Sequence, residues 1–190
     1  MIKIIDNFLS QSYFNKIEDV TTSSTFEWFS TNNITDGELP QLSHIGFSHP
    51  ICYNNDFTGS GFSFLLSGFL YQTMDLIERK NIIRSRFDMT VYNPNKIMYL
   101  PHVDIEEPYI PNITTILYIT DNLDCETVIF DKKIFKKEDK KNLDTAKLKV
   151  LKKVQPKRNR LVIFDGSYLH TGHSPIYENK RILINSNFSN

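Results

Sequence analysis

The sequence lacks the features that define several large protein classes. It has only two cysteines, Cys52 and Cys125, in 190 residues, so a disulfide framework is not expected. No apolar run approaches ~18 residues, the length needed for a membrane-spanning helix. The first ten residues, MIKIIDNFLS, contain no long apolar region with a cleavage site and do not resemble a signal peptide. We therefore expect a cytoplasmic protein with reduced thiols and no membrane association.

The chain also has no net charge, but its basic and acidic residues are unevenly distributed along the sequence. Residues 131–160 contain 13 of the 22 Lys and Arg and only four of the 22 Asp and Glu, a local charge of +9. A basic block can bind phosphates or an acidic partner. This one lacks the interleaved aromatic residues on which single-stranded bases stack. We interpret it as a solvated insertion between strands and do not expect a nucleic acid partner.

The first part of the chain predicts a strand and two helices. The strand is IKIID, and the first helix follows Ser10 and extends to about Thr21. The second helix lies in FSFLLSGFLYQTMDLIERK, where one apolar stripe indicates core packing. That stripe consists of Phe62, Leu65, Leu66, Phe69, Leu70, Met74 and Ile77. Between Phe26 and Gly61 the turn signals, among them His49-Pro50, predict irregular loop.

After Arg84 the pattern changes to short extended runs separated by Pro, Asn, Asp and Gly. The runs are RFDMTVYN, KIMYLPHVD, NITTILYIT, ETVIFD, KVLKKVQ, NRLVIFD and KRILINSNF. Their β-branched and aromatic residues are typical of strands. Two helices followed by seven or more strands predict one α+β domain over residues 1–190, whose sheet part is a sandwich or jelly roll. Residues 1–83 would support the strands of residues 84–190.

The stretch YLPHVDIEEPYIPN places His102 and Asp104 two residues apart. With five His and 13 Asp in the chain, about 0.34 such pairs arise by chance, so the pair alone decides nothing. In a strand the two side chains point to the same side and could bind one metal ion. A third ligand would have to come from another strand, and His170 and His173, which follow NRLVIFD, are the candidates. His44 and His49 are interpreted as structural or loop residues.

Two histidines and one carboxylate leave three positions of an octahedral ion open, as in non-haem Fe(II) oxygenases. Zinc would more often be closed off by a fourth ligand. Open positions imply a co-substrate. Arg181, which begins the last predicted strand, could bind the far carboxylate of a bidentate organic acid.

In order and spacing, these runs resemble the catalytic core of prolyl-hydroxylase-like 2-oxoglutarate/Fe(II) dioxygenases. The similarity covers roughly residues 84–190 and includes DMTVYNPNKIMYLPHVD, DCETVIF and NRLVIFDGSYLH. It implies a double-stranded β-helix, a jelly roll with the iron in its mouth. His102, Asp104 and His170 match the iron ligands, with His170 preferred over His173 by its distance from Phe164. The match also assigns co-substrate binding to Arg181, Tyr92 and Tyr118, and a wall of the pocket to Tyr99.

The resemblance implies Fe(II), 2-oxoglutarate and O2 as cofactors, with ascorbate as an accessory, and hydroxylation of an unactivated C–H bond. A prolyl residue in a protein or peptide is the first substrate expected, with a free amino acid or another small molecule as the alternative. A nucleic acid demethylase of the same superfamily would typically carry a second arginine where this chain has Asn187. A catalytically silent jelly-roll binding module is the alternative outside the enzymes. Asp124-Cys125 replaces a glycine pair that is common in the family, and Cys125 is expected to be a buried, unreactive thiol.

Overall fold

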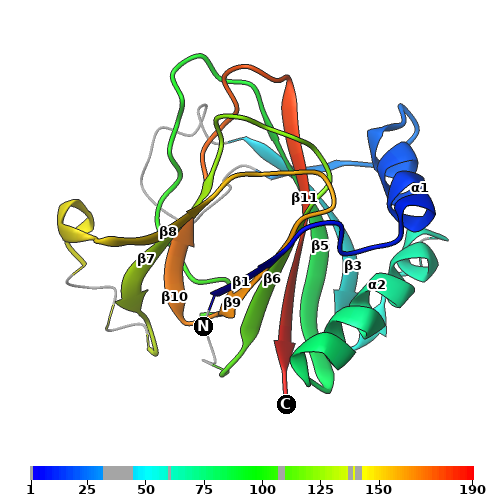
Figure 1. Cartoon of the computed structure of the whole chain (residues 1–190), viewed down its shortest axis with the longest axis horizontal. Coiled ribbons are helices and arrows are strands. Elements are labelled where there is room, and N and C mark those ends of the chain that lie inside the picture. Colours follow the sequence, from blue (N-terminus) through cyan, green and yellow to red (C-terminus); the bar gives the residue numbers. More distant parts are fainter. Residues whose placement is uncertain (1, 32–44, 60, 107–109, 137–138, 140–142) are drawn as a thin grey trace.

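The computed structural model describes residues 2–31, 45–59, 61–106, 110–136, 139 and 143–190. Two helices, α1 (Gln11–Thr22) and α2 (Gly61–Ile77), accompany two antiparallel sheets (Figure 1). The larger sheet has the order β1-β9-β6-β11-β5-β3-β2, with β4 paired to β3. The smaller has the order β10-β7-β8. The strand bounds are β1 Ile2–Ile5, β2 Phe29–Thr31, β3 Gly46–Tyr53, β4 Asp56–Phe57, β5 Asn81–Val91, β6 Ile113–Tyr118, β7 Thr127–Lys133, β8 Val150–Val154, β9 Leu161–Asp165, β10 Tyr168–Thr171 and β11 Lys180–Ser189, and a short 3-10 helix spans Thr145–Lys147.

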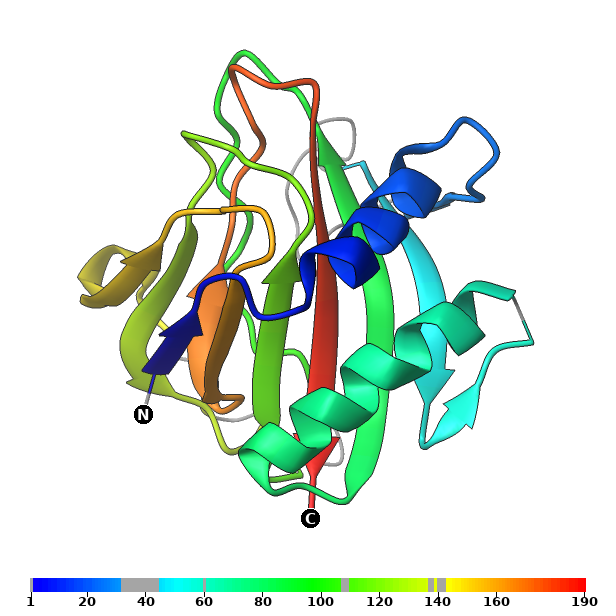
Figure 2. The same cartoon turned by 45° about the vertical axis from the view of Figure 1, so that its right-hand side comes forward.

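Both helices pack on one face of the larger sheet (Figure 2). Phe14 and Ile17 of α1 and Leu66 and Phe69 of α2 are buried in one core cluster with Phe87 of β5. The other residues of the predicted α2 stripe either lie in this cluster or pack against it, so the stripe is confirmed. A helix stripe that buries apolar area against a sheet is the dominant source of its stability. Among the described residues, neither helix is long and apolar enough to cross a membrane.

A second cluster fills the space between the two sheets. It contains Ile116 of β6, Ile129 of β7, Phe164 of β9 and Leu183 of β11. The segment before Asp104 pairs with β10 and the residues after it through two isolated bridges, Met98 to His173 and His102 to His170. Pro101 lacks the N–H that a continuous ladder needs, which explains why the predicted strand KIMYLPHVD is reduced to two bridges.

The prediction of irregular structure between Phe26 and Gly61 is wrong for the part of this range that the structure describes. It contains β2, β3 and β4, and β3 pairs along β5. The dipeptide His49-Pro50, taken as a turn signal, lies within β3. The register of β3 shifts between Pro50 and Cys52, and a bulge is one of the places in a sheet where proline is tolerated. His49 is buried in the core as expected for a structural residue, whereas His44 lies outside the described residues.

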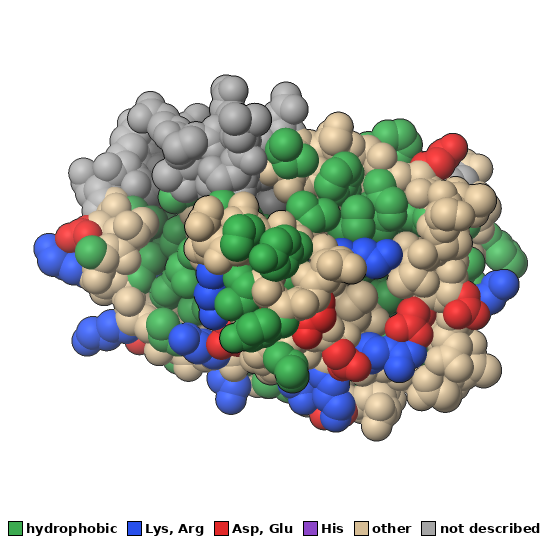
Figure 3. Space-filling model, turned by 90° about the horizontal axis from the view of Figure 1, so that it is seen from above, with side chains coloured by type: hydrophobic (Ala, Val, Ile, Leu, Met, Phe, Trp, Pro, Cys, Tyr) green, Lys and Arg blue, Asp and Glu red, His purple; other side chains and the backbone are tan. Residues whose placement is uncertain are grey.

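The basic segment 131–160 is more than a solvated insertion. It supplies the end of β7 and all of β8. Arg158 binds Glu18 of α1 through two hydrogen bonds, and Arg160 and Lys157 both bind Asp6. These three basic side chains therefore hold the N-terminal segment in place through ion pairs. On the face shown in Figure 3, basic side chains lie among acidic and polar ones and do not form one continuous basic area.

Candidate metal centre

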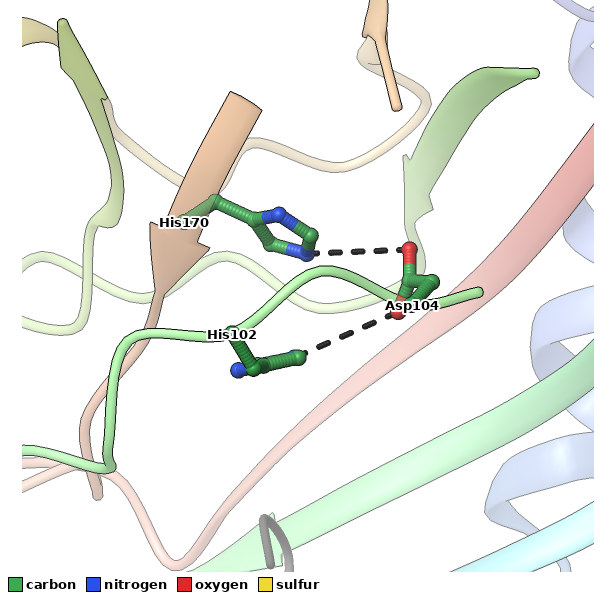
Figure 4. Close-up of side chains that lie close together, drawn as sticks. All are labelled: His102, Asp104 and His170. Atoms are coloured by element: carbon green, nitrogen blue, oxygen red, sulfur yellow. Dashed lines mark ion pairs between the residues drawn. The ribbon is translucent and has the colours of Figure 1, made fainter. Parts of the chain in front are cut away.

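His102, Asp104 and His170 converge between the two sheets. His102 and His170 are bridge partners, and the backbone N–H of each donates to the carbonyl of the other, at 3.0 and 2.9 Å. Their ring centroids lie 4.7 Å apart. One ligand atom from each of the three residues lies within 4.8 Å of the others, and both imidazoles point toward the carboxylate (Figure 4). The chain thus brings together three groups from two separate segments.

Backbone carbonyls orient both imidazoles. Nδ1 of His102 donates to the carbonyl of Leu100 at 3.0 Å, and Nδ1 of His170 donates to that of Tyr168 at 3.1 Å. The Nε2 atoms then lie 4.0 and 3.6 Å from the nearest Asp104 oxygens. An imidazole that donates through one nitrogen presents a lone pair on the other, which is the usual arrangement of a metal-binding histidine.

Asp104 is a buried carboxylate surrounded by donors. Arg84 donates to Oδ1 at 3.1 Å, Asn187 and Thr114 donate to Oδ2 at 3.0 and 3.2 Å, and Asn185 reaches both oxygens. Burial raises the pKa of this carboxyl, but the neighbouring His170, Arg84 and His102 and the hydrogen bond from Asn187 together outweigh burial, so the net pKa lies below its usual range. The group is therefore ionised at neutral pH and suited to a cation.

This donor set fits Fe(II). Two neutral imidazoles and one carboxylate on one side of an ion leave the remaining coordination positions to small molecules. His173, the alternative third ligand, lies elsewhere: its Nε2 is 2.8 Å from Glu126 Oε2 and its Nδ1 is 3.0 Å from the carbonyl of Ser174. Both nitrogens of His173 are occupied by oxygen acceptors, so the structure groups His170 with His102 and Asp104.

Arg181 lines the same cavity as the three candidate ligands. This cavity measures about 770 Å³ including its open mouth. Nη2 of Arg181 donates to Thr127 Oγ1 at 2.8 Å, and Tyr118 donates to the same oxygen at 2.6 Å. The side chain is buried, its Nε has no hydrogen-bond partner, and no ion pair in the described part of the chain includes it. A buried guanidinium without a counter-ion is a fitting site for the carboxylate of a ligand.

The three tyrosines differ in position. Tyr99 lines the cavity, and burial raises its pKa to about 12, which keeps the hydroxyl protonated as a donor. Tyr118 is fully buried, and the Arg181 guanidinium lies 5.5 Å from its ring centroid. Tyr92, which follows the last residue of β5, is half exposed and is not part of the cavity lining. The structure therefore does not bring Tyr92 to the predicted co-substrate contact.

Several residues that hold the site in place were not assigned from the sequence, among them Thr114, which donates to Asp104. Arg84, Asn185 and Asn187 hold Asp104, and Thr127 joins Tyr118 to Arg181. The available signal was polar residues at alternate positions of RSRFDMT and LINSNF, which direct polar groups to one face of each strand. Cys125 is buried as expected, and burial raises its pKa to about 12.

No protein-family description and no curated protein sequence matches the chain. Solved structures do match. A Pseudomonas putida prolyl-4-hydroxylase has a TM-score of 0.61 at 12% identity, covering 99% of this chain and 91% of its own. A Trichoplax adhaerens prolyl hydroxylase, in complex with a hypoxia inducible factor oxygen degradation domain peptide fragment, has a TM-score of 0.67 at 14% identity, covering 99% and 83%. The non-haem α-ketoglutarate-dependent epimerase SnoN from nogalamycin biosynthesis has a TM-score of 0.67 at 6% identity, covering 100% and 76%.

At such low identities the similarity concerns the fold. The chain has the double-stranded β-helix fold shared by prolyl hydroxylases and other 2-oxoglutarate/Fe(II) oxygenases, with two supporting helices. This confirms the predicted α+β architecture and the jelly-roll core.

Proposed function

We propose that this chain is a 2-oxoglutarate- and Fe(II)-dependent dioxygenase that hydroxylates an unactivated C–H bond, with residues 1–190 forming one catalytic domain. The observation that carries the proposal is the convergence of His102, Asp104 and His170 beside the buried guanidinium of Arg181. A site that only stored a metal would have no use for an unpaired arginine in the same cavity. The fold of the similar structures supports the same chemistry.

In this proposal His102, Asp104 and His170 hold the iron. Iron with 2-oxoglutarate and O2 supplies an oxidant able to remove hydrogen from a C–H bond, while 2-oxoglutarate is converted to succinate and CO2. Arg84, Asn185 and Asn187 keep Asp104 ionised and fixed in orientation. The carbonyls of Leu100 and Tyr168 keep the imidazoles turned inward.

Arg181 would bind the far carboxylate of 2-oxoglutarate. Thr127 holds its guanidinium in place, and the hydroxyl of Tyr118 fixes Thr127 in turn. Tyr99 would form a wall that excludes water. This division of roles leaves orientation and water exclusion to the protein and the oxidation to the cofactor.

For the substrate we propose a prolyl residue in a protein or peptide first, because one similar structure holds a peptide fragment. A free amino acid or another small molecule is retained as the alternative. Nucleic acid is disfavoured for two reasons. Position 187, where a nucleic acid demethylase would typically carry a second arginine, is an asparagine that binds Asp104. Several basic side chains of residues 131–160 also pair with acidic residues of this chain. Ascorbate as an accessory and a cytoplasmic location, with Cys52 and Cys125 as free thiols, complete the proposal.

The test is conversion of 2-oxoglutarate to succinate by the full chain with Fe(II) in air, alone and with proline-containing peptides and free amino acids. We expect succinate that requires both iron and O2, with an oxygenated product from at least one substrate. The matched control is the same chain loaded with Mn(II). Binding of iron and 2-oxoglutarate without any succinate would instead identify a catalytically silent binding module.

A further inference from the structure

The face of β5 that points between the two sheets carries two charged residues, Arg86 and Asp88, to which the proposed reaction assigns no role. Arg84, Arg86 and Asp88 alternate along the strand, so their side chains point into the space between the sheets. Arg84 is bonded to Asp104. Arg86 and Asp88 line the cavity but touch none of the three candidate ligands through a hydrogen bond in the described chain. They form a separate polar group beside the metal position.

Asp88 fixes Arg86 in one orientation. Nε of Arg86 lies 2.8 Å from Oδ1 and 3.1 Å from Oδ2 of Asp88. The two terminal nitrogens of the guanidinium have no hydrogen-bond partner in the described part of the chain, although the side chain is only 32% exposed. A guanidinium held through Nε presents the paired N–H groups that fit a carboxylate.

Stability alone does not explain this pair. A partly buried ion pair pays a desolvation cost, and apolar residues of similar volume are often equally stabilising. The charge of Asp88 raises the pKa of Arg86, which stays a cation, whereas burial raises the pKa of Asp88 against the opposing charges of Arg86 and Arg84. Charged groups kept in a cavity beside a reactive centre indicate recognition of a ligand.

Arg86 lies apart from Arg181. In the β5–β11 register Arg86 faces Asn185, which binds Asp104, whereas Arg181 faces Thr90. Asn185 and Arg181 are four residues apart on β11, a backbone separation of about 14 Å. Arg86 and Arg181 therefore lie at different positions along the strands that line the cavity. A 2-oxoglutarate molecule bound to Arg181 would leave Arg86 free to bind another ligand.

The charges of the cavity favour an anionic group on the substrate. Among the described residues, the charged side chains that line it or bind Asp104 are Arg84, Arg86 and Arg181 against Asp88 and Asp104, so basic groups outnumber acidic ones. A divalent metal and dianionic 2-oxoglutarate cancel each other. The remaining positive charge therefore favours a substrate that presents a carboxylate.

We infer that Arg86 is a specificity-determining residue that binds a carboxylate of the substrate, with Asp88 as its positioning residue. The inference rests on the proposed function and narrows its substrate to a carboxylic acid. The carboxylate belongs either to a free amino or organic acid or to an acidic side chain next to the oxidised residue of a peptide. Both sources offer the same planar anion to the guanidinium.

The test measures binding to the full chain loaded with Mn(II) and 2-oxoglutarate, because Mn(II) broadens the NMR signals of molecules bound nearby. One set of probes is the L-amino acids and their carboxamides. The other is capped peptides with one Asp or Glu and the same peptides with Asn or Gln. We expect carboxylates of one set to bind and their amides to bind at least about ten-fold more weakly. The set that binds identifies the source of the carboxylate.

The variants separate recognition from folding. Arg86→Gln should lower the affinity for the bound carboxylate at least about ten-fold while the affinities for Mn(II) and 2-oxoglutarate stay unchanged. The double variant Arg86→Gln with Asp88→Asn, which leaves no unpaired charge, should show the same loss. Asp88→Ala should weaken binding, and Asp88→Asn should restore it because an amide oxygen still accepts from Nε.

Equal binding of acids and amides, or full carboxylate affinity in the double variant, would overturn the inference. So would the absence of any bound carboxylate on a chain that holds Mn(II) and 2-oxoglutarate. Failure to bind Mn(II) or 2-oxoglutarate would overturn the proposed function and this inference with it.

Discussion

Gly172 lies directly against the guanidinium of Arg181. A Cβ at Gly172 would lie 3.1 Å from Nη1 and 3.7 Å from Cζ of Arg181. The absence of a side chain at position 172 therefore gives the arginine its place in the cavity. We expect Gly172→Ala to shift the guanidinium by a few tenths of an ångström and to weaken 2-oxoglutarate binding about three- to ten-fold, equivalent to about 1 kcal/mol. Gly172→Val should weaken it further.

Calorimetric titration with 2-oxoglutarate in the presence of Mn(II) would measure this effect. Gly59→Ala is the matched control, because a Cβ at Gly59 meets nothing within 4 Å. An unchanged affinity in Gly172→Val would contradict the assigned role of Arg181.

Removing the guanidinium itself should have a larger effect. Arg181 is buried, and a carboxylate bound to it would be desolvated. Arg181→Ala should therefore cost roughly 2–5 kcal/mol, or about 30- to several-thousand-fold in 2-oxoglutarate affinity. Iron affinity, measured in the same variant without 2-oxoglutarate, should remain. A chain whose 2-oxoglutarate affinity did not change on this substitution would refute the assignment.

The histidines should separate sharply in a metal-binding assay. His102→Ala and His170→Ala should each lower Fe(II) affinity by more than about 100-fold, since even partners of metal ligands are worth about 10- to 100-fold. His173→Ala should keep most of the affinity, because both nitrogens of His173 are bonded to Glu126 and Ser174. Anaerobic Fe(II) titration followed by succinate release measures both properties. Loss confined to His173→Ala would reverse the choice of third ligand.

Local patterns sufficed for much of the fold. The apolar stripe of α2 and the extended runs that became β5, β6, β7, β8, β9 and β11 are signals within single elements. The spacing of His102 and Asp104 does not identify the third metal ligand, which lies far away in the sequence. The choice of His170 came from the resemblance to the dioxygenase family. Strand β3 was missed because proline at position 50 is a turn signal locally, and only its bulged pairing with β5 makes it compatible with a strand.

The sequence does not predict that charged side chains lie between the two sheets, and the reason is physical. Arg84, Arg86 and Asp88 alternate with the buried Ser85 and Phe87, and the same pattern describes a strand with one face in water. Only the second sheet turns this polar face into a cavity. The donors to Asp104 from Asn185 and Asn187 are likewise long-range pairs, 81 and 83 residues away in sequence.

Asn187 should matter for the metal although it is not a candidate ligand. Its side chain donates to Asp104 Oδ2 and to Thr114 Oγ1, both at 3.0 Å, and it is fully buried. Asn187→Ala removes one donor from the carboxylate and allows it to turn, so we expect Fe(II) affinity to fall about 10- to 100-fold. Asn95→Ala, at an exposed position, is the control. Equal metal affinity in the two variants would show that Arg84 and Asn185 hold Asp104 without Asn187.

The contact between the basic segment and the N-terminal segment predicts a dependence of stability on pH. Hydrogen bonds from Arg160, opposed by burial and assisted by Lys157, hold the pKa of Asp6 well below its usual value. A carboxyl whose pKa is lowered by folding stabilises the protein above its unfolded pKa of about 4, and the contribution is lost as pH falls toward the folded pKa. Because these groups are partly exposed, Asp6→Asn should lower the free energy of unfolding at pH 7 by only about 0.5–1 kcal/mol.

Urea unfolding at pH 7, 5, 4 and 3 measures this contribution. The difference between the wild-type chain and Asp6→Asn should be constant from pH 7 to 5 and shrink below about pH 4, because the unfolded wild-type chain then binds a proton at Asp6 that the folded chain does not. Asp75→Asn is the control, since Asp75 is exposed on α2 and forms no ion pair in the described part of the chain. A difference that persisted undiminished at pH 3 would mean that Asp6 stabilises the N-terminal segment through hydrogen bonds that survive protonation, and that its charge contributes nothing.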